Sequence, residues 1–186
     1  MHNPDLKKWL PPDRYKHSLR VEKVAVKLAE HYGISKEKAA AAALLHDCGR
    51  YTKGEKLVSE AKKLGLKVSE IERFQPKLLH ARIGAIIARK VFRVKDKEIL
   101  SAISKHTVGS ENMSMLEKIV YIADHIESDR RFKGVEKIRR HAFSNIDRAI
   151  AESTSLMINK LLAKGFPISE QTVRTRNYYL GINNAK

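Results

Sequence analysis

Several histidines and aspartates of the chain occupy positions where apolar residues at helical spacing predict a side chain that faces the core. For example, His17 precedes Val21 by one helical turn, and His80 precedes Ile83 by three residues. His17, His46, Asp47, His80, His106 and Asp124 form this set. Imidazole and carboxylate groups at buried positions require partners, and the kind of partner determines the chemistry.

A shared metal is the partner that satisfies all six residues together. Each residue alone is most simply explained as a hydrogen-bonded core or cap residue. A buried aspartate without a partner costs free energy, however, and two of them among unpaired histidines cost more. Neutral imidazole nitrogens and carboxylate oxygens are ligands for Zn, Fe, Mn or Ni rather than for Ca or Mg. The set therefore predicts a metal centre.

Helices must position these residues, because apolar positions recur three and four apart and no segment alternates as a strand does. The predicted helices cover residues 12–32, 35–45, 54–64, a segment after Pro76, 96–106, 114–127, 135–143, 146–164 and 169–180. Pro, Ser and Asp at their starts and Gly at their ends fit helix termini. We therefore expect an all-α fold of about nine helices. A single domain spans 1–186, with a core over about 12–145 on which C-terminal helices 146–180 pack.

Composition narrows the class of protein. The chain has 186 residues, of which 42% are hydrophobic and 31% charged, which excludes a disordered chain. No apolar run approaches the about 20 residues that a membrane span needs, so no membrane partner is expected. Cys48 is the only cysteine, which excludes an intrachain disulfide and favours the cytoplasm. The net charge of +16 fits an anionic partner or simply a solvated surface.

The order His17, His46-Asp47, Asp124, with His80 and His106 before the last aspartate, resembles the HD-domain metal phosphohydrolases. Longer stretches resemble the YqeK-type branch, which cleaves diadenosine tetraphosphate symmetrically. They are Arg14-Tyr15-x-His17, Leu44-Leu45-His46-Asp47, Leu78-Leu79-His80, His106-Thr107, Met115-Leu116-Glu117-Lys118-Ile119, Ala123-Asp124-x-Ile126-Glu127, Arg130-x-Phe132-x-Gly134-Val135 and Thr172-x-x-x-Arg176-Asn177. After His46-Asp47 the chain has Cys48-Gly49-Arg50, where the branch usually has a small residue and a lysine.

The resemblance implies a single HD helical domain with a dinuclear metal centre. His17, His46, Asp47 and Asp124 would hold one metal, and Asp47 would bridge to a second metal held by His80 and His106. The family's metal is commonly iron, although the ligands also suit Mn, Co, Ni or Zn. A hydroxide held by both metals would attack an inner phosphorus of diadenosine tetraphosphate and release two ADP.

The resemblance also implies which residues contact the substrate. Asp47 and Arg130 would be catalytic, and His17, His80 and His106 would face the substrate from the metal centre. The further substrate-binding residues are Thr107, Arg130, Thr172, Arg176 and Asn177. For Arg130 the alternative is a solvated charge, and for the last three residues it is an ordinary helix surface.

Two other functions remain open at this stage. An HD site also hydrolyses mononucleotides or other phosphoesters, because fold and metal do not fix the substrate. A basic helical module that binds RNA or a nucleoprotein would also explain the charge. Nucleic acid is not the expected partner, because all six ligand positions are filled and no RNA-reading motif with interleaved aromatics is present. A homodimer is compatible with the resemblance, and no sequence patch identifies its interface.

Overall fold

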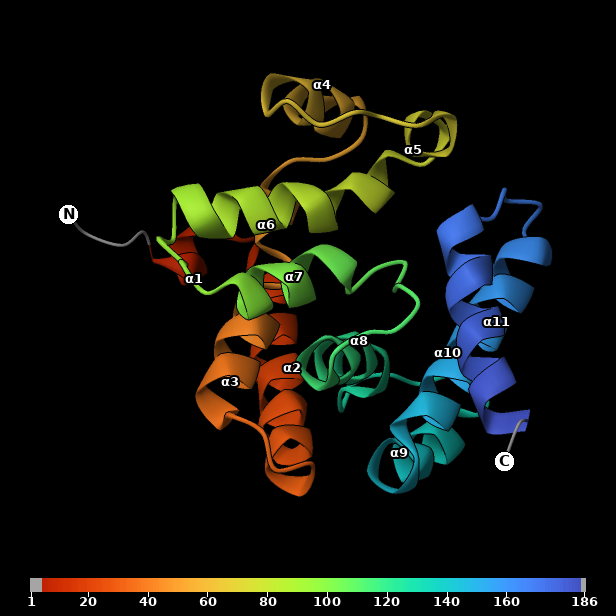
Figure 1. The fold of residues 1–186 in the computed structure, drawn as a ribbon. Coiled ribbons are helices and arrows are strands. Elements are labelled where there is room, and N and C mark those ends of the chain that lie inside the picture. The colour runs from red at the N-terminus through yellow and green to blue at the C-terminus, as the bar shows by residue number, and fades with distance from the viewer. Residues whose placement is uncertain (1–4, 185–186) are drawn as a thin grey trace.

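The computed structural model describes residues 5–184, and every regular element in that range is helical (Figure 1). The long helices are α2 (Pro12–His31), α3 (Lys36–Leu45), α4 (Glu55–Lys63), α6 (His80–Lys90), α7 (Lys97–Lys105), α8 (Met115–Ile126), α9 (Val135–Ser144), α10 (Ile146–Leu162) and α11 (Glu170–Asn184). The shorter elements are α1 (Leu6–Trp9), α5 (Glu70–Phe74) and two 3₁₀ turns, η1 (Cys48–Tyr51) and η2 (Pro76–Leu79). The all-α prediction with about nine helices is confirmed for the described residues.

The helices begin where the sequence offers a cap. Pro12 stands at the start of α2, where its missing N–H costs nothing. The Ser35 hydroxyl accepts from the backbone N–H of the third residue of α3, and the Asp96 carboxylate accepts from two N–H groups of α7. Ser114 forms a capping box with Glu117 at the start of α8. These caps fix the starts of α3, α7 and α8, and four of the six predicted ligands lie on these helices or directly after them.

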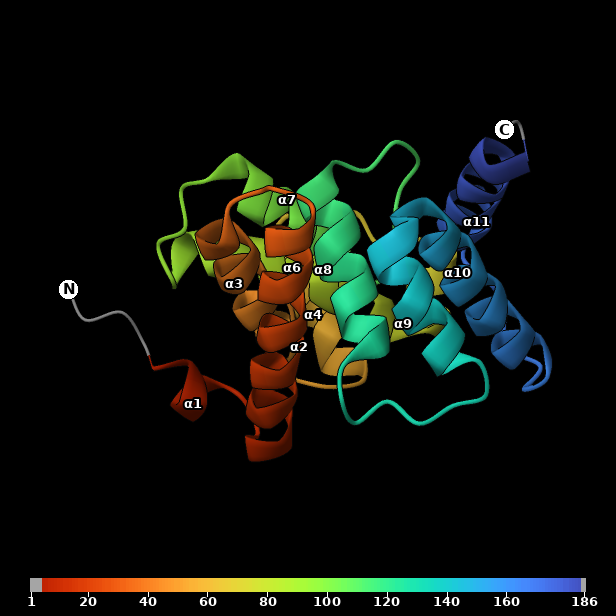
Figure 2. The same ribbon diagram turned by 90° about the horizontal axis from the view of Figure 1, so that it is seen from below.

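The helices surround a core in which α2 and α8 are central (Figures 1 and 2). Helix α2 packs against α3 and α8, and α7 packs against α6, α3 and α8. Helix α10 packs on α8 and α9, and α11 packs on the outer side of α10. Side chains that are fully buried in this core include Val21, Leu28, Ile83, Ile103, Ile119 and Ile122. The predicted ligands thus lie on five elements that converge around α2 and α8.

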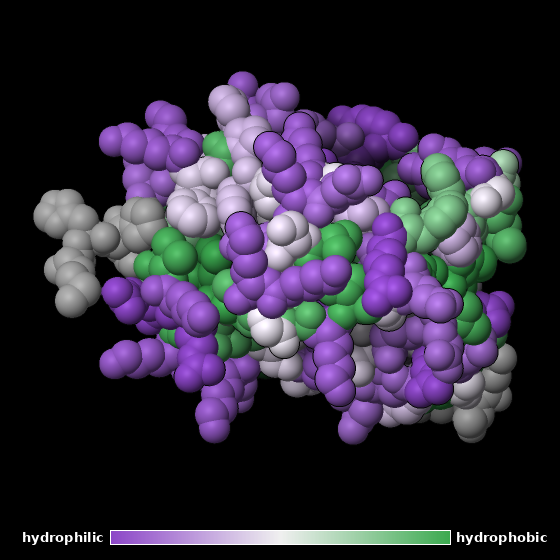
Figure 3. Space-filling model, turned by 90° about the horizontal axis from the view of Figure 1, so that it is seen from above, coloured by the Kyte–Doolittle hydropathy of each residue, from purple (hydrophilic) through white to green (hydrophobic). Residues whose placement is uncertain are grey.

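The face formed by α4, α5 and α6 is mainly hydrophilic, with smaller apolar areas between long side chains (Figure 3). Lys56, Lys62 and Lys63 of α4 are exposed, as is Lys53, which precedes this helix. A cationic surface of this kind raises the local concentration of polyanions without reading their structure. Within residues 5–184, no helix combines the length and the apolar character that a membrane crossing requires.

Candidate metal centre

All six predicted ligands come together in the structure. His17 lies within α2, and His46 and Asp47 follow the end of α3. His80 begins α6, His106 follows α7, and Asp124 lies near the end of α8. Three overlapping trios have ligand atoms within 4.8 Å of one another: His17–His46–Asp47, His46–His106–Asp124 and Asp47–His80–His106. Together the trios contain the whole predicted set, although its members are spread over more than one hundred residues of sequence.

The rings of three of the histidines are oriented by the same contact, between Nδ1 and a backbone carbonyl oxygen. The Nδ1 atoms of His46 and His106 lie 2.6 and 2.7 Å from the carbonyl oxygens of Ala43 and Ile103, three residues earlier. His80 makes the same contact with Lys77. Carbonyl oxygens in the last turn of a helix have free acceptor capacity, so they can accept these ring N–H groups. Each Nδ1 therefore carries the proton, and each Nε2 presents a lone pair to the centre.

The resulting lone pairs fit a metal ion, and at least two of the three have no hydrogen-bond donor among the described residues. The Nε2 atoms of His80 and His106 face each other at 2.9 Å, and neither carries a proton in this arrangement. The Thr107 hydroxyl, 3.1 and 3.2 Å from them, can donate to only one. The Nε2 atom of His46 is buried and has no hydrogen-bond partner within residues 5–184. Burial lowers the pKa of His46 and of His80 to about 4, so both are neutral ligands near pH 7.

The Asp47 carboxylate lies near three of the proposed histidine ligands and two arginines. Its Oδ1 lies 2.5 Å from Arg50 Nε, 3.2 Å from His80 Nε2 and 3.7 Å from His106 Nε2, and its Oδ2 lies 3.3 Å from Arg14 Nη1 and 3.7 Å from His46 Nε2. Burial alone raises the pKa of this carboxyl, but nearby positive charge, on the surrounding histidines when they are protonated and on Arg50, holds it well below its ordinary value. The carboxylate is therefore charged at neutral pH and has both oxygens directed toward ligand nitrogens.

Asp124 and His17 form the second part of the centre, and Glu127 supports them. Asp124 Oδ1 lies 2.9 Å from His17 Nε2, and the other ring nitrogen of His17 lies 3.3 Å from Glu127 Oε1. Glu127 is buried and accepts from Arg20 Nε at 2.7 Å. A carboxylate behind a ligating imidazole fixes the orientation of its ring. The resemblance motif contains Glu127, but sequence reasoning gave it no role, because nothing in the sequence links it to His17.

Arg130 also lies at this centre, in contact with a proposed ligand. Its Nη2 donates to Asp124 Oδ1 at 2.6 Å, and its Nε donates to the Asp124 carbonyl oxygen at 2.9 Å. The side chain is 39% exposed. Burial raises the pKa of the Asp124 carboxyl, but His17 and Arg130, with the nearby histidines, hold it well below its ordinary value. Arg130 is thus close enough to serve both this carboxylate and a ligand from solvent.

Thr107 connects the centre to a cavity of about 480 Å³. The lining of this cavity includes Lys67, Arg82, Ser104, Thr107, Ser169 and Gln171. Because the Thr107 hydroxyl also touches His80 and His106, this cavity reaches the edge of the metal centre. The lining also includes apolar side chains such as Val68, Ile71 and Leu78, so the cavity suits a ligand with both polar and apolar parts.

The other predicted substrate residues lie on α11, outside the contacts of the centre. Thr172 is buried, Arg176 Nε donates to Ser155 Oγ at 3.3 Å, and Arg176 Nη1 donates to Asn177 Oδ1 at 3.0 Å. Gln171, which lines the cavity beside Thr107, precedes Thr172 by one residue. The roles predicted for Thr172, Arg176 and Asn177 stay predictions.

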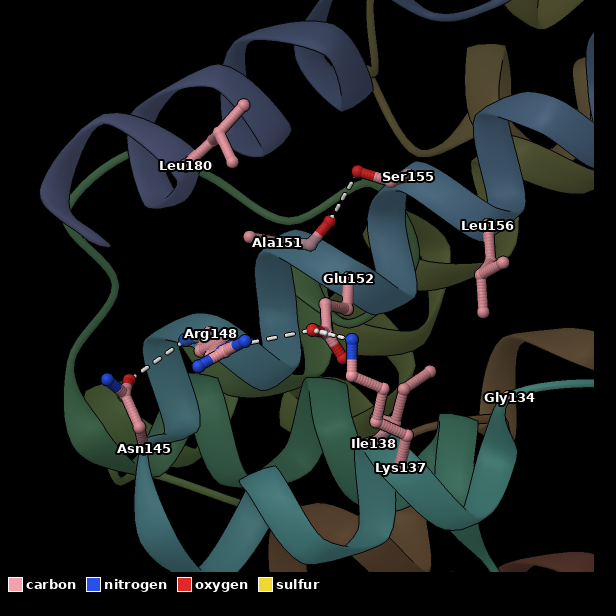
Figure 4. A pocket seen from close by; sticks show the side chains of 10 residues that line it. All are labelled: Gly134, Lys137, Ile138, Asn145, Arg148, Ala151, Glu152, Ser155, Leu156 and Leu180. Atoms are coloured by element: carbon pink, nitrogen blue, oxygen red, sulfur yellow. Dashed lines mark hydrogen bonds and ion pairs between the residues drawn. The ribbon is translucent and has the colours of Figure 1, made fainter. Parts of the chain in front are cut away.

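A larger cavity, of about 650 Å³, lies between α9, α10 and α11 and contains none of the six ligands (Figure 4). The charged side chains that line it pair with one another: Lys137 and Arg148 form ion pairs with Glu152, at 2.8 and 3.5 Å. His125, beside Asp124, belongs to none of the three donor trios, and its Nδ1 lies 2.8 Å from the Tyr121 carbonyl oxygen. These features leave the His–Asp cluster as the candidate site.

Known proteins share both the sequence and the fold of this chain. Residues 14–129 match the HD domain. A Halalkalibacterium halodurans protein named "Bis(5'-nucleosyl)-tetraphosphatase, symmetrical" is 39% identical over 176 residues, covering 94% of this chain and 93% of that protein. A Bacillus subtilis protein of the same name is 32% identical over 173 residues, covering 93% and 92% of the two chains.

A solved structure of an HD superfamily hydrolase has the same fold as this chain. The Clostridium acetobutylicum protein described as a predicted HD superfamily hydrolase involved in NAD metabolism superposes with a TM-score of 0.91. It is 40% identical, and the match covers 95% of this chain and 93% of that one. The donor cluster, the matched domain and the near full-length relatives agree. The chain belongs to the HD-domain family, in the group that contains the symmetrical bis(5'-nucleosyl)-tetraphosphatases.

Proposed function

We propose that the chain is a metal-dependent phosphohydrolase that cleaves diadenosine tetraphosphate symmetrically into two ADP. The observation that carries this proposal is the convergence of His17, His46, Asp47, His80, His106 and Asp124 on one buried centre. The relatives that match almost the whole chain, and bear the name of this activity, support the choice of substrate.

We further propose that the centre holds two metal ions, with iron as the physiological metal and Mn, Co, Ni or Zn as substitutes. Asp47 belongs to two of the three trios, one containing His17 and the other containing His80. Its two oxygens are directed toward different histidines, as a shared ligand requires. When bound, the metal ions lower the pKa of water and neutralise charge on phosphate oxygens. Metal analysis of purified protein tests both the identity and the expected two ions per chain.

The reaction balances without a strong acid from the protein. Water supplies the oxygen that bonds to an inner phosphorus, and the bond from that phosphorus to the central bridging oxygen breaks. One ADP gains the oxygen of water and the other keeps the bridging oxygen, while the two protons of water pass to the products and solvent. A diphosphate is a good leaving group, so this chain has to orient and neutralise phosphates. The half-exposed guanidinium of Arg130 suits that task.

Diadenosine tetraphosphate incubated with metal-loaded protein should give ADP as the sole nucleotide product. In ¹⁸O-labelled water, each cleavage should place one label on the terminal phosphate of one ADP. The physical reason is that the centre acts on the middle of the phosphate bridge. Chromatography and mass spectrometry of the products measure both outcomes.

ATP plus AMP would contradict symmetric cleavage but leave the metal centre intact. Turnover only of mononucleotides would favour the broader phosphohydrolase, and salt-sensitive RNA binding without hydrolysis would favour the binding module.

Arg130→Ala should lower kcat/KM for diadenosine tetraphosphate about ten- to hundredfold and leave the metal content unchanged. The arginine supplies charge-assisted hydrogen bonds worth about 1.5–3 kcal/mol to an anionic group. Asp124 keeps its 2.9 Å contact with His17 in the variant, so the ligand stays in place. Steady-state kinetics and metal analysis measure the two effects. Arg131→Ala, at an exposed neighbouring position, is the matched control. Metal loss in parallel with rate would make Arg130 a structural residue.

We also propose that the enzyme works in the cytoplasm and forms a homodimer. The single thiol, Cys48, is buried, and burial raises its pKa to about 12, so it is kept in the unreactive thiol form. Cell fractionation tests the location. Sedimentation analysis of the metal-loaded protein tests the dimer.

A further inference from the structure

The turn that follows α8 carries Arg130, and a side chain of α9 that is remote from the ligands holds this turn. Helices α8 and α9 pack against each other and are joined by residues 127–134 (Figure 2). The side chain of Arg139, in α9, is 23% exposed, compared with 39% for Arg130. Both arginines lie beyond residues 14–129, the part of the chain that matches the HD domain. This side of the site is therefore built by the segment that follows the matched domain.

Three backbone carbonyl groups around the turn accept hydrogen bonds from Arg139. Its Nε donates to the Ile126 carbonyl oxygen at 3.0 Å, and its Nη2 donates to those of Glu127 and Arg130 at 2.8 and 3.3 Å. Its Nη1 donates to Glu136 Oε1 at 2.5 Å. Ile126 is the last residue of α8, so its carbonyl has no helical partner and needs a donor from elsewhere. All three guanidinium nitrogens of Arg139 thus donate to the protein itself.

These contacts fix the main chain from which the Arg130 side chain extends. The Arg130 carbonyl oxygen also accepts from Arg131 Nη1 at 3.3 Å, but Arg131 belongs to the same turn and is exposed. Arg20 of α2 holds the beginning of the turn from the other side, through the Glu127 carboxylate at 2.7 Å. Arg139 therefore connects the far end of the turn, at Arg130, to a packed helix.

We propose that Arg139 is a positioning residue, which holds the turn after α8 so that the Arg130 guanidinium stays at the metal centre. The inference rests on the proposed function, in which Arg130 bonds a phosphate of the substrate. The acceptors lie around Nε, Nη1 and Nη2 of one planar group, and the single ammonium of a lysine cannot reach all of them. Without this fork the turn gains freedom, and Arg130 must be ordered anew each time that a substrate binds.

Arg139→Lys should lower kcat/KM for diadenosine tetraphosphate about five- to thirtyfold, and Arg139→Ala at least as much, through the lost hydrogen bonds. The lysine keeps the positive charge and the apolar stem, so its effect reports the missing fork. Metal content should not change, because Glu127 keeps its contact with Arg20. Arg140→Ala, at the next and exposed position of α9, is the matched control and should have the kinetics of the wild type. Steady-state kinetics and metal analysis measure these effects, and thermal unfolding shows that each variant is folded at the assay temperature.

A double-mutant cycle separates positioning from a general loss of structure. If Arg139 acts through Arg130, adding Arg139→Lys to Arg130→Ala should lower kcat/KM by less than about twofold further, since no guanidinium remains to be positioned. A merely structural role would lower kcat/KM by the same factor in both backgrounds.

Three results would overturn the positioning role while the wild-type protein still forms ADP. They are wild-type kcat/KM in Arg139→Lys, an equal loss in both backgrounds, and loss of metal in parallel with rate. A wild-type protein that forms no ADP would instead overturn the proposed function and the positioning role together. Unchanged kcat/KM in Arg130→Ala would overturn the role of Arg130 and, with it, that of Arg139.

Discussion

Replacing Asp47 with alanine should empty the metal centre and abolish phosphohydrolysis, with the helical content close to that of the wild-type protein. Asp47 is the only carboxylate in two of the donor trios, so its loss removes an anionic ligand from each. The remaining trio, His46–His106–Asp124, keeps one carboxylate, but both of its histidines also belong to the trios that lose Asp47. We expect metal content to fall from two ions per chain to nearly none, and turnover to fall by about three orders of magnitude or more.

The fold should survive this change because the groups around Asp47 tolerate its absence. Arg14 and Arg50 reach solvent and can be hydrated there. His46 and His80 are neutral near pH 7, and each keeps its Nδ1 contact with a backbone carbonyl. Circular dichroism therefore separates loss of the site from loss of the fold.

Metal analysis and a product assay measure the effect of the Asp47 substitution. Asp129→Ala is the control, since Asp129 is 63% exposed and pairs with Arg20 at 3.1 Å without contacting a proposed ligand. That variant should keep its metals and its turnover. If Asp47→Ala retained two metals and near-normal turnover, the assignment of Asp47 as the shared ligand would be wrong.

Much of the fold could be predicted because the signals for it are local. Ser35, Asp96 and Ser114 cap the helices that the sequence predicts after them. Helices α1 and α5 were not predicted, because four or five residues are too few to show an apolar period. The capping box of α5, formed by Ser69 and Glu72, is visible in the sequence, but a helix of one turn depends on its tertiary contacts.

For the site, the sequence predicts the ligands but not the contacts between them. Each of the six ligands lies on a recognisable helix face or helix end, and their order resembles a known family. The contacts between them were not predictable, because they depend on how α2 and α8 pack. His17 and Glu127 are 110 residues apart in sequence and meet only through that packing. In the same way, Arg14 reaches Asp47 across 33 residues, so the arginines around the centre emerge only in three dimensions.

Close packing between η1 and α6 holds two of the ligands in position. A Cβ atom on Gly49 would lie 2.1 Å from the His80 carbonyl oxygen and 2.7 Å from the Gly84 backbone nitrogen. Both atoms belong to backbone and cannot rotate away. Gly49 follows Asp47 by two residues, and the obstructed carbonyl belongs to another ligand, His80. Any relief of this contact must move the segment after Asp47 away from the start of α6.

Gly49→Ala should therefore destabilise the protein by about 3 kcal/mol and weaken metal binding, although the new methyl group touches no ligand atom. For a chain of this size, that loss lowers Tm by roughly 6–12 °C. Thermal unfolding and metal titration of the same sample measure both effects, which should occur together because one displacement causes both. Gly181→Ala is the matched control: that glycine lies in α11 with nothing within 4 Å of its added Cβ, so Tm should stay equal or rise slightly. A Gly49→Ala protein with the Tm and metal affinity of the wild type would show that this contact does not position the ligands.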